Sequence, residues 1–367
     1  MTGFVPPPYP YDRLQPILQA AERHEGGAIN LSIGAPSDPP PPAAVAMLAN
    51  SASERGYPPS IGSVAYREAA ARWYERRVGV TVSAADEVAA AVGSKEFVAG
   101  LPNYLRLRSP DRDTVLYPAV SYPSYAMGAT LGGCRAVPVP VRPDWTIDLE
   151  AIDPSDAARA LVLWVNTPAN PAGSLDDLGQ AAAWGRANAV PVVSDECYIE
   201  FTWAGPPRSI LQHGTEGVLA LHSLSKRSNW AGARSSFYAG DVELVHYLRE
   251  VRKHGGFMQP GPVQAASVVA LDDDAHVDEQ RQRYRERLEF GCELMAAAGA
   301  PAEMPQGGFY LWVAAPGGDA WALTAELAER TGVVVSPGEF YGEAGAGHVR
   351  VALVAPMEQL RLARSRL

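Results

Sequence analysis

VPVVSDECY, residues 190–198, is an apolar run that ends in a polar cluster, and VLALHSLSK, residues 218–226, has the same arrangement. Upstream, ALVLWVN at residues 160–166 and AAAVGS at residues 89–94 also pass from apolar to polar side chains. Short apolar runs of this kind predict buried strands. Because helical stretches separate them, the pattern predicts the α/β class, with a mostly parallel sheet covered by helices on both faces.

The alternation continues along most of the chain and defines the expected elements. We expect strands near residues 88–92, 114–117, 135–139, 160–165, 190–194 and 218–222, with helices near 64–77, 95–106 and 243–254. Farther on, a long charged helix at 275–298 precedes strands near 309–314 and 348–354 and a helix near 320–331. This second pattern predicts a smaller α+β domain.

Three parts are expected along the chain. The proline-rich residues 1–42 predict an N-terminal arm and small-domain segment with one short helix. A large domain is expected over residues 43–255 and a small C-terminal domain over residues 256–367. The helix near 243–254 is expected to bridge the two domains, with GGFMQPGP at 255–262 as a hinge-like break.

The composition favours a folded protein with a small-molecule partner. The 367 residues are 47% hydrophobic, and a net charge of −10 disfavours nucleic acid and anionic membranes as partners, since both attract basic surfaces. The N-terminal sequence has no leader pattern, and no apolar run approaches the roughly 20 residues that span a bilayer, so we expect a cytoplasmic protein. Cys134, Cys197 and Cys292 are widely separated, which predicts reduced core thiols and neither a disulfide framework nor a metal site.

Polar side chains at the ends of four predicted strands are expected to converge, because ligands of parallel sheets bind outside the carboxyl ends of the strands. The converging residues are Asp195 and Tyr198, then Ser223, Ser225, Lys226 and Arg234, then Asn166 and Asn170. Ser94 follows Gly93 at a predicted helix start, where free N–H groups bind phosphate. A carboxylate, a lysine, hydroxyls and an arginine at one edge predict a site for a phosphate-bearing cofactor.

The order of these motifs resembles that of the class I/II aminotransferases of fold type I, which use pyridoxal 5′-phosphate. The matching stretches are Gly93–Ser94, NTPANPAG at 166–173, SDECY at 194–198, SLSK at 223–226 with Arg234, YPPSIGSVAYREA at 57–69 and GHVRVAL at 347–353. Together they span nearly the whole chain. Within the family, SDECYIEF, LHSLSKRSNWAG and VRKHGGFMQPGPVQAA look most like the actinobacterial-type N-succinyldiaminopimelate aminotransferases. The resemblance implies a mostly parallel seven-stranded sheet in the large domain.

The resemblance also implies the catalytic roles. Lys226 would form the Schiff base with the cofactor and, once released, move a proton between the substrate Cα and C4′. Asp195 would pair with the pyridinium nitrogen, while Tyr198 and Asn170 would hydrogen-bond the phenolic oxygen of the ring. The structural alternatives are a solvated surface lysine for Lys226, a strand-end cap for Asp195 and a turn residue for Asn170.

The remaining site residues follow from the same resemblance. Phosphate would be held by Ser94, Lys95, Ser223, Ser225, Arg234 and, from the neighbouring subunit of a homodimer with shared active sites, Tyr57. Tyr122 would stack on the ring, and Arg350 would bind the substrate α-carboxylate with help from Asn170 and the backbone N–H of Gly34. The plainer alternatives are capping for Ser223 and Ser225, a core tyrosine for Tyr122, a turn glycine for Gly34 and a surface salt bridge for Arg350.

The implied activity is ping-pong amino transfer with 2-oxoglutarate and glutamate, and the favoured substrate is N-succinyl-LL-2,6-diaminopimelate. Another amino-acid aminotransferase, a C–S lyase or decarboxylase of the same fold, and a non-enzymatic sensor stay open. Candidates for reading the distal carboxylates are Arg227, Arg252, Lys253 and His254, with a solvated helix face as the alternative. Two departures from the family pattern are Ala172 in place of threonine and the bulkier pair Ser235 and Ser236 after Arg234.

Overall fold

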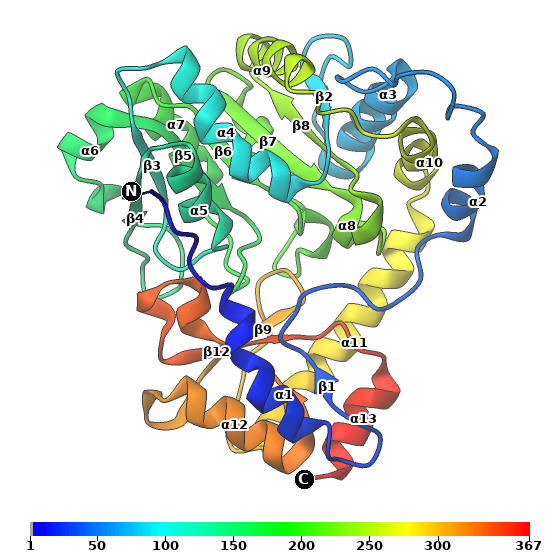
Figure 1. The fold of residues 1–367 in the computed structure, drawn as a ribbon, viewed down its shortest axis with the longest axis vertical. Helices are drawn as coiled ribbons and strands as arrows, with labels where there is room; N and C mark the ends of the chain where they lie inside the picture. Colours follow the sequence, from blue (N-terminus) through cyan, green and yellow to red (C-terminus); the bar gives the residue numbers. More distant parts are fainter. Residues whose placement is uncertain (1–2) are drawn as a thin grey trace.

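A computed structural model describes residues 3–367 and shows a larger part above a smaller one (Figure 1). A seven-stranded sheet forms the centre of the larger part, and a three-stranded sheet lies in the smaller part. The long helix α11 (Ala275–Ala297) runs from one part to the other. The fold is therefore α/β with a smaller α+β part, as the sequence predicts.

The seven-stranded sheet is parallel except at one strand. Its order is β2-β8-β7-β6-β5-β3-β4, and β8 runs antiparallel to both of its neighbours. The strands are β2 (Val88–Ala91), β3 (Thr114–Pro118), β4 (Arg135–Val139), β5 (Ala160–Asn166), β6 (Val192–Asp195), β7 (Val218–Ser223) and β8 (Ser236–Gly240). Every residue of β5, β6 and β7 is buried, as expected for parallel strands that are covered on both faces.

Helices form a separate apolar layer on each face of this sheet. On one face pack α4 (Ser94–Arg108), α5 (Ser124–Leu131) and α9 (Val242–His254). On the other face pack α3 (Val64–Trp73), α7 (Leu178–Asn188) and α10 (Gly261–Asp272). Polar N-caps begin several of these helices: Ser63, Asp177 and Asp241 each accept a backbone N–H bond, worth about 1 kcal/mol apiece.

The smaller part combines both ends of the chain. Its antiparallel sheet has the order β11-β12-β9, from β9 (Tyr310–Ala314), β11 (Ser336–Pro337) and β12 (His348–Ala352). The short strand β1 (Ile29–Asn30) pairs in parallel with β10 (Val333–Val334), and α1 (Gln15–Ala21) packs against α12 (Ala320–Thr331). The C-terminal helix α13 (Met357–Ser365) packs against α11.

The prediction that the helix near 243–254 bridges the two parts is wrong. The corresponding helix, α9, packs against β8 and β2 at the far end of the larger part (Figure 1). After it, α10 packs against α2 (Pro42–Asn50) and α3, so the chain stays in the larger part until α11 begins. The domain boundary at 255–256 stays a prediction, and this packing favours a later position near Asp272–Asp274.

Two short helices complete the larger part: α6 (Pro154–Arg159) precedes β5, and α8 (Leu224–Arg227) follows β7 directly. Because α8 begins where β7 ends, its four residues lie at the carboxyl edge of the sheet. Across residues 3–367, no helix is both long and apolar enough to cross a bilayer.

Candidate active site

A cavity of about 300 Å³ lies at the carboxyl ends of the central parallel strands, between the larger and smaller parts. It is lined by twelve of the thirteen residues to which the resemblance gives a role in the site: Gly34, Ser94, Lys95, Tyr122, Asn170, Asp195, Tyr198, Ser223, Ser225, Lys226, Arg234 and Arg350. The thirteenth, Tyr57, is 94% exposed and does not line the cavity. Its expected role in a partner's site stays a prediction.

Lys226 extends from α8 into the cavity. Its amine donates a hydrogen bond to the carbonyl of Gly34 and lies 5.8 Å from the centre of the Phe309 ring. Burial, assisted by the positive charges of Arg350 and Arg234, lowers the pKa of this amine to about 8. The lowered pKa increases the neutral fraction of the amine near neutral pH, which suits a lysine that must act as a nucleophile.

Asp195 ends β6 and points its buried carboxylate at the same cavity. The hydroxyl of Tyr125 donates to Oδ2 at 2.9 Å, and the backbone N–H of Cys197 donates to Oδ1 at 3.2 Å. Burial raises the pKa of Asp195 despite these two bonds. The carboxylate is thus held in one orientation and has the chemistry to accept a bond from a protonated ring nitrogen.

Hydroxyls and cations gather at the helix start near Gly93. Ser94 begins α4, where the backbone N–H groups are free, and Gly93 has a φ of 83° that favours glycine. A Cβ at Gly93 would overlap the guanidinium of Arg234, so glycine is also needed for this close approach. Ser223 lines the cavity while its hydroxyl accepts the Ser225 N–H at 3.1 Å, so capping and site lining occur together.

Arg350 lies on β12 and lines the cavity from the smaller part. It donates to Asn170 Oδ1 at 2.8 Å and to the Ser32 carbonyl at 2.6 Å. Its side chain is only 3% exposed, and no carboxylate among residues 3–367 forms an ion pair with it. The surface salt bridge proposed as an alternative is therefore wrong. A buried guanidinium without an anion favours an anionic ligand strongly.

Gly34 is required by close packing and not by an unusual turn. A Cβ at this position would overlap the hydroxyl of Tyr310, while the φ of Gly34 is not positive. The Gly34 carbonyl accepts a hydrogen bond from the Lys226 amine, so the structure shows the backbone of Gly34 acting as an acceptor. Its expected N–H bond to substrate stays a prediction.

Sequence reasoning missed several residues that line this cavity or contact its lining. Tyr310 contacts Tyr198, hydroxyl to hydroxyl at 2.7 Å, and Tyr125 holds Asp195. Cys197, expected only as a core thiol, also lines the wall, while Cys134 and Cys292 are half-buried. From the N-terminal arm, Tyr9 and Tyr11 reach the cavity as well. The position of Cys197 within SDECY, beside the strand end, was the one local signal for any of them.

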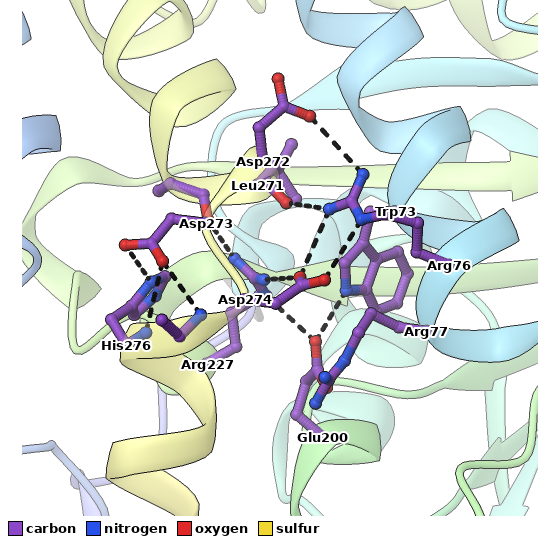
Figure 2. Close-up of polar contacts among 12 residues, drawn as sticks. Trp73, Arg76, Arg77, Glu200, Arg227, Leu271, Asp272, Asp273, Asp274 and His276 are labelled. Carbon is purple, nitrogen blue, oxygen red and sulfur yellow. Dashed lines mark hydrogen bonds and ion pairs between the residues drawn. The ribbon is translucent and has the colours of Figure 1, made fainter.

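Arg227, a candidate for reading the distal end of the substrate, does not line the cavity, and Figure 2 shows its side chain directed at Glu200. Its Nε donates to Glu200 at 3.2 Å, and Trp73 and Arg77 donate to the same buried carboxylate. Arg252 pairs with Glu96 through two bonds of 2.7 Å. Lys253 and His254 are exposed and do not line the cavity.

The serine pair after Arg234 lies in the core behind the cavity. Ser235 Oγ bonds Ser267 Oγ at 2.7 Å, and Ser236 Oγ donates to the Ala91 carbonyl at 3.1 Å. Both hydroxyls therefore have partners, and their extra bulk is accommodated between β8, β2 and α10.

The chain belongs to the class I and II aminotransferases, because the model of that family, Aminotransferase class I and II, matches residues 27–367. It is 42% identical to the 4-dedimethylamino-4-oxo-anhydrotetracycline transaminase OxyQ of Streptomyces rimosus, over 98% of this chain and 99% of the relative. It is 34% identical to the LL-diaminopimelate aminotransferase of Aquifex aeolicus, over 98% and 96%. A solved structure, the probable N-succinyldiaminopimelate aminotransferase from Thermus thermophilus, matches with a TM-score of 0.87 at 34% identity, over 97% of this chain and 100% of that one.

Enzymes of this family depend on pyridoxal phosphate, and this chain is a pyridoxal-phosphate-dependent aminotransferase. The donor set of the cavity fits that cofactor. A lysine amine, a buried carboxylate and a hydroxyl-rich helix start with an arginine face one volume of about 300 Å³, which is within the range of small-molecule sites.

Proposed function

We propose that this aminotransferase exchanges the amino group of an α-amino acid with the 2-oxoglutarate and glutamate pair in two half-reactions at one site. The observation that carries the proposal is Arg350, a buried cation without an anionic partner in residues 3–367, which shares a cavity with the amine of Lys226. A carboxylate held by Arg350 brings the α-carbon of an amino acid toward that amine. Holding the substrate at one end determines which bond at Cα breaks.

Ten residues of the cavity have a proposed task. Bound pyridoxal phosphate supplies an electron sink for negative charge that develops at the substrate Cα. Ser94, Lys95, Ser223, Ser225 and Arg234 hold the phosphate, and Tyr122 stacks on the ring. Asp195 keeps the ring nitrogen protonated, while Tyr198 and Asn170 hydrogen-bond its phenolic oxygen. Lys226 would hold the cofactor through its amine and, when that amine is free and neutral, would take the proton from the substrate Cα.

The site is proposed to be shared within a homodimer. Tyr57 is fully accessible in one chain and follows α2 on the surface of the larger part. In the proposed dimer its hydroxyl reaches the phosphate end of the neighbouring cavity, so neither subunit alone has a complete site. A cytoplasmic location stays a prediction from the sequence.

N-succinyl-LL-2,6-diaminopimelate is the proposed amino donor. Support comes from the similarity to the Thermus thermophilus enzyme and, for the related free diamino acid, to the Aquifex aeolicus enzyme. Lys95 provides a cation at the cavity, 5.4 Å from the Tyr9 ring, for a distal carboxylate. In this assignment Lys95 binds both the cofactor phosphate and the distal carboxylate of the substrate. Arg227 and Arg252 cannot take the second role, because they form ion pairs with Glu200 and Glu96.

A second candidate is amino transfer to a ring carbonyl, as the name of the 42% identical relative OxyQ describes for that protein. The aromatic side chains Tyr9, Tyr11 and Tyr122, together with Ile33, line the cavity and suit a flat, apolar substrate. This candidate requires glutamate as the donor but no second carboxylate on the acceptor.

Half-reactions test these proposals directly. Purified protein loaded with pyridoxal phosphate is mixed separately with glutamate, N-succinyl-LL-diaminopimelate, LL-diaminopimelate and alanine, and the cofactor absorbance is followed. Conversion by glutamate and the succinylated substrate supports the proposal, and Lys226→Ala serves as the inactive control. Conversion by glutamate alone overturns the succinylated substrate and favours the second candidate. Conversion by none of them, with pyruvate and ammonia released from a cysteine-type substrate, overturns amino transfer.

A further inference from the structure

Tyr310 connects the two ends of the cavity. It begins β9, is buried, and lines the cavity wall. Its hydroxyl lies 2.7 Å from that of Tyr198, and the guanidinium of Arg350 lies 4.2 Å from its ring centre. One side chain from the smaller part thus contacts a proposed cofactor ligand and the proposed substrate ligand.

The hydroxyl and the ring of Tyr310 have separable contacts. Within residues 3–367, Tyr198 is the hydrogen-bond partner of the Tyr310 hydroxyl, and the ring supports Arg350 and fills the space beside Gly34. A phenylalanine would keep the ring contacts and lose the hydroxyl pair. The two buried hydroxyls satisfy each other, and removing one of them leaves the other without this partner.

The direction of the hydrogen bond between the two hydroxyls matters. Burial raises the pKa of both Tyr198 and Tyr310, so both carry a proton at neutral pH. A tyrosine hydroxyl has one proton to donate and can also accept. If Tyr198 gives its proton to Tyr310, it has none left for another acceptor in the cavity. If Tyr310 donates, the proton of Tyr198 is free.

We propose that Tyr310 is a positioning residue that donates to Tyr198, orients the Tyr198 proton into the cavity and strengthens it as a donor to the phenolic oxygen of the bound cofactor. The inference rests on the proposed role of Tyr198 and extends it to a residue on a different part of the fold. Donation in series strengthens each bond of the chain. Because the Tyr310 ring also packs against Arg350, a shift of β9 changes the positions of Arg350 and Tyr198 together.

The test is a pH titration of the visible absorbance of the bound cofactor, which needs no amino donor. Donation to the phenolic oxygen stabilises its ionised form, so Tyr198→Phe should raise the titration midpoint. Tyr310→Phe should raise it by a smaller amount, roughly 0.3 to 0.5 pH unit, because it removes only the cooperative part of one bond. The double variant should match Tyr198→Phe alone, since Tyr310 acts through Tyr198.

Tyr247→Phe is the matched control. It removes a hydroxyl that donates to the Tyr104 carbonyl at 2.6 Å, away from the cavity, and should leave the midpoint unchanged. The Michaelis constant for glutamate should stay near wild type in Tyr310→Phe and rise in Tyr310→Leu, which loses the ring under Arg350. An unchanged titration midpoint in Tyr310→Phe overturns the proposal. The proposal is also overturned if adding Tyr310→Phe to Tyr198→Phe shifts the midpoint by as much as Tyr310→Phe shifts it in the wild type. Failure of the wild-type half-reaction with glutamate would instead overturn the proposed function.

Discussion

Lys226 and Arg227 are neighbours in the chain, yet their side chains serve opposite sides of α8. The amine of Lys226 contacts the Gly34 carbonyl in the cavity, while Arg227 donates to the buried carboxylate of Glu200 at 3.2 Å (Figure 2). Because α8 has only four residues, a side chain anchored on its far side restricts where Lys226 can lie. Glu200 is the centre of this anchor, since Trp73 and Arg77 also donate to it.

Glu200→Gln should therefore destabilise the protein. The Glu200 side chain is 3% exposed, and removing its charge takes away the buried anion that Arg227 and Arg77 share. Each arginine then keeps only its more exposed acidic partner, Asp274 for Arg227 and Asp278 for Arg77. Loss of one partner in a buried ion pair costs about 3 to 5 kcal/mol, measured as the free energy of unfolding in urea. Glu243→Gln, at an exposed ion pair of 3.4 Å with Arg108, should change it by less than about 0.5 kcal/mol. Similar values for the two variants would contradict this account.

Stability should depend on pH through Lys226. Burial lowers its pKa to about 8 in the folded protein, whereas the unfolded chain keeps the usual value near 10.5. Between these values the unfolded chain binds more protons, so the free energy of unfolding should rise with pH. For the cofactor-free protein the contribution of Lys226 to the free energy of unfolding should rise by about 2 kcal/mol from pH 7.5 to 9.5. It is measured in urea as the difference between wild type and Lys226→Met, because buried Cys197 and buried tyrosines, whose pKa values are raised, titrate with the opposite sign in the same range. Lys226→Met should abolish this increment, and an identical pH profile in the variant would show that the amine is not buried.

Asp195→Asn should separate stability from activity. Burial raises the pKa of the carboxyl, so keeping its charge in the folded protein lowers the free energy of unfolding. Asparagine keeps an oxygen for Tyr125 and loses the charge proposed to hold the ring nitrogen protonated. We expect turnover to fall by about 100-fold or more while the midpoint of thermal unfolding stays level or rises. Near-normal turnover would contradict the role of Asp195.

Hybrid dimers should show whether Tyr57 acts across subunits. Tyr57→Ala and Lys226→Ala should each be impaired as homodimers. A mixed dimer has one site with both defects and one site with neither, so it should recover about half of wild-type activity. Differently tagged subunits, purified as the hybrid, provide the measurement. A hybrid no more active than the average of its parents would place Tyr57 outside the partner's site, and a fully active monomer would exclude the shared site altogether.

The strand ends could be predicted from sequence because chain order and sheet geometry place them together. VPVVSDECY and VLALHSLSK each carry their polar residues at the carboxyl end, and parallel strands align those ends. The strand β8 was missed, since SSFYAG follows Arg234 without a helix between and runs antiparallel. The bridging helix was misplaced because both α9 and α11 have helical patterns, and only packing distinguishes them.

Tyr310 and Tyr125 could not be predicted, for a physical reason that applies to both. Each contacts its partner through tertiary packing, Tyr310 with Tyr198 and Tyr125 with Asp195, and nothing nearby in the chain marks either one. A tyrosine in an apolar run is usually a core residue. Arg227 shows the converse, because its position beside Lys226 suggested a site residue and its ion pair with Glu200 removes it from the cavity.

The pairing of β1 with β10 has a consequence for the order in which the enzyme matures on the ribosome. Ile29 leaves the ribosome early, while its partner Val333 is made near the end of synthesis. At about 5 to 20 residues per second, the first strand waits roughly 15 to 60 s for that partner. The seven-stranded sheet can form during the delay, but Arg350 cannot yet bond the Ser32 carbonyl. A nascent chain therefore carries Lys226 on a folded surface long before it can hold a substrate.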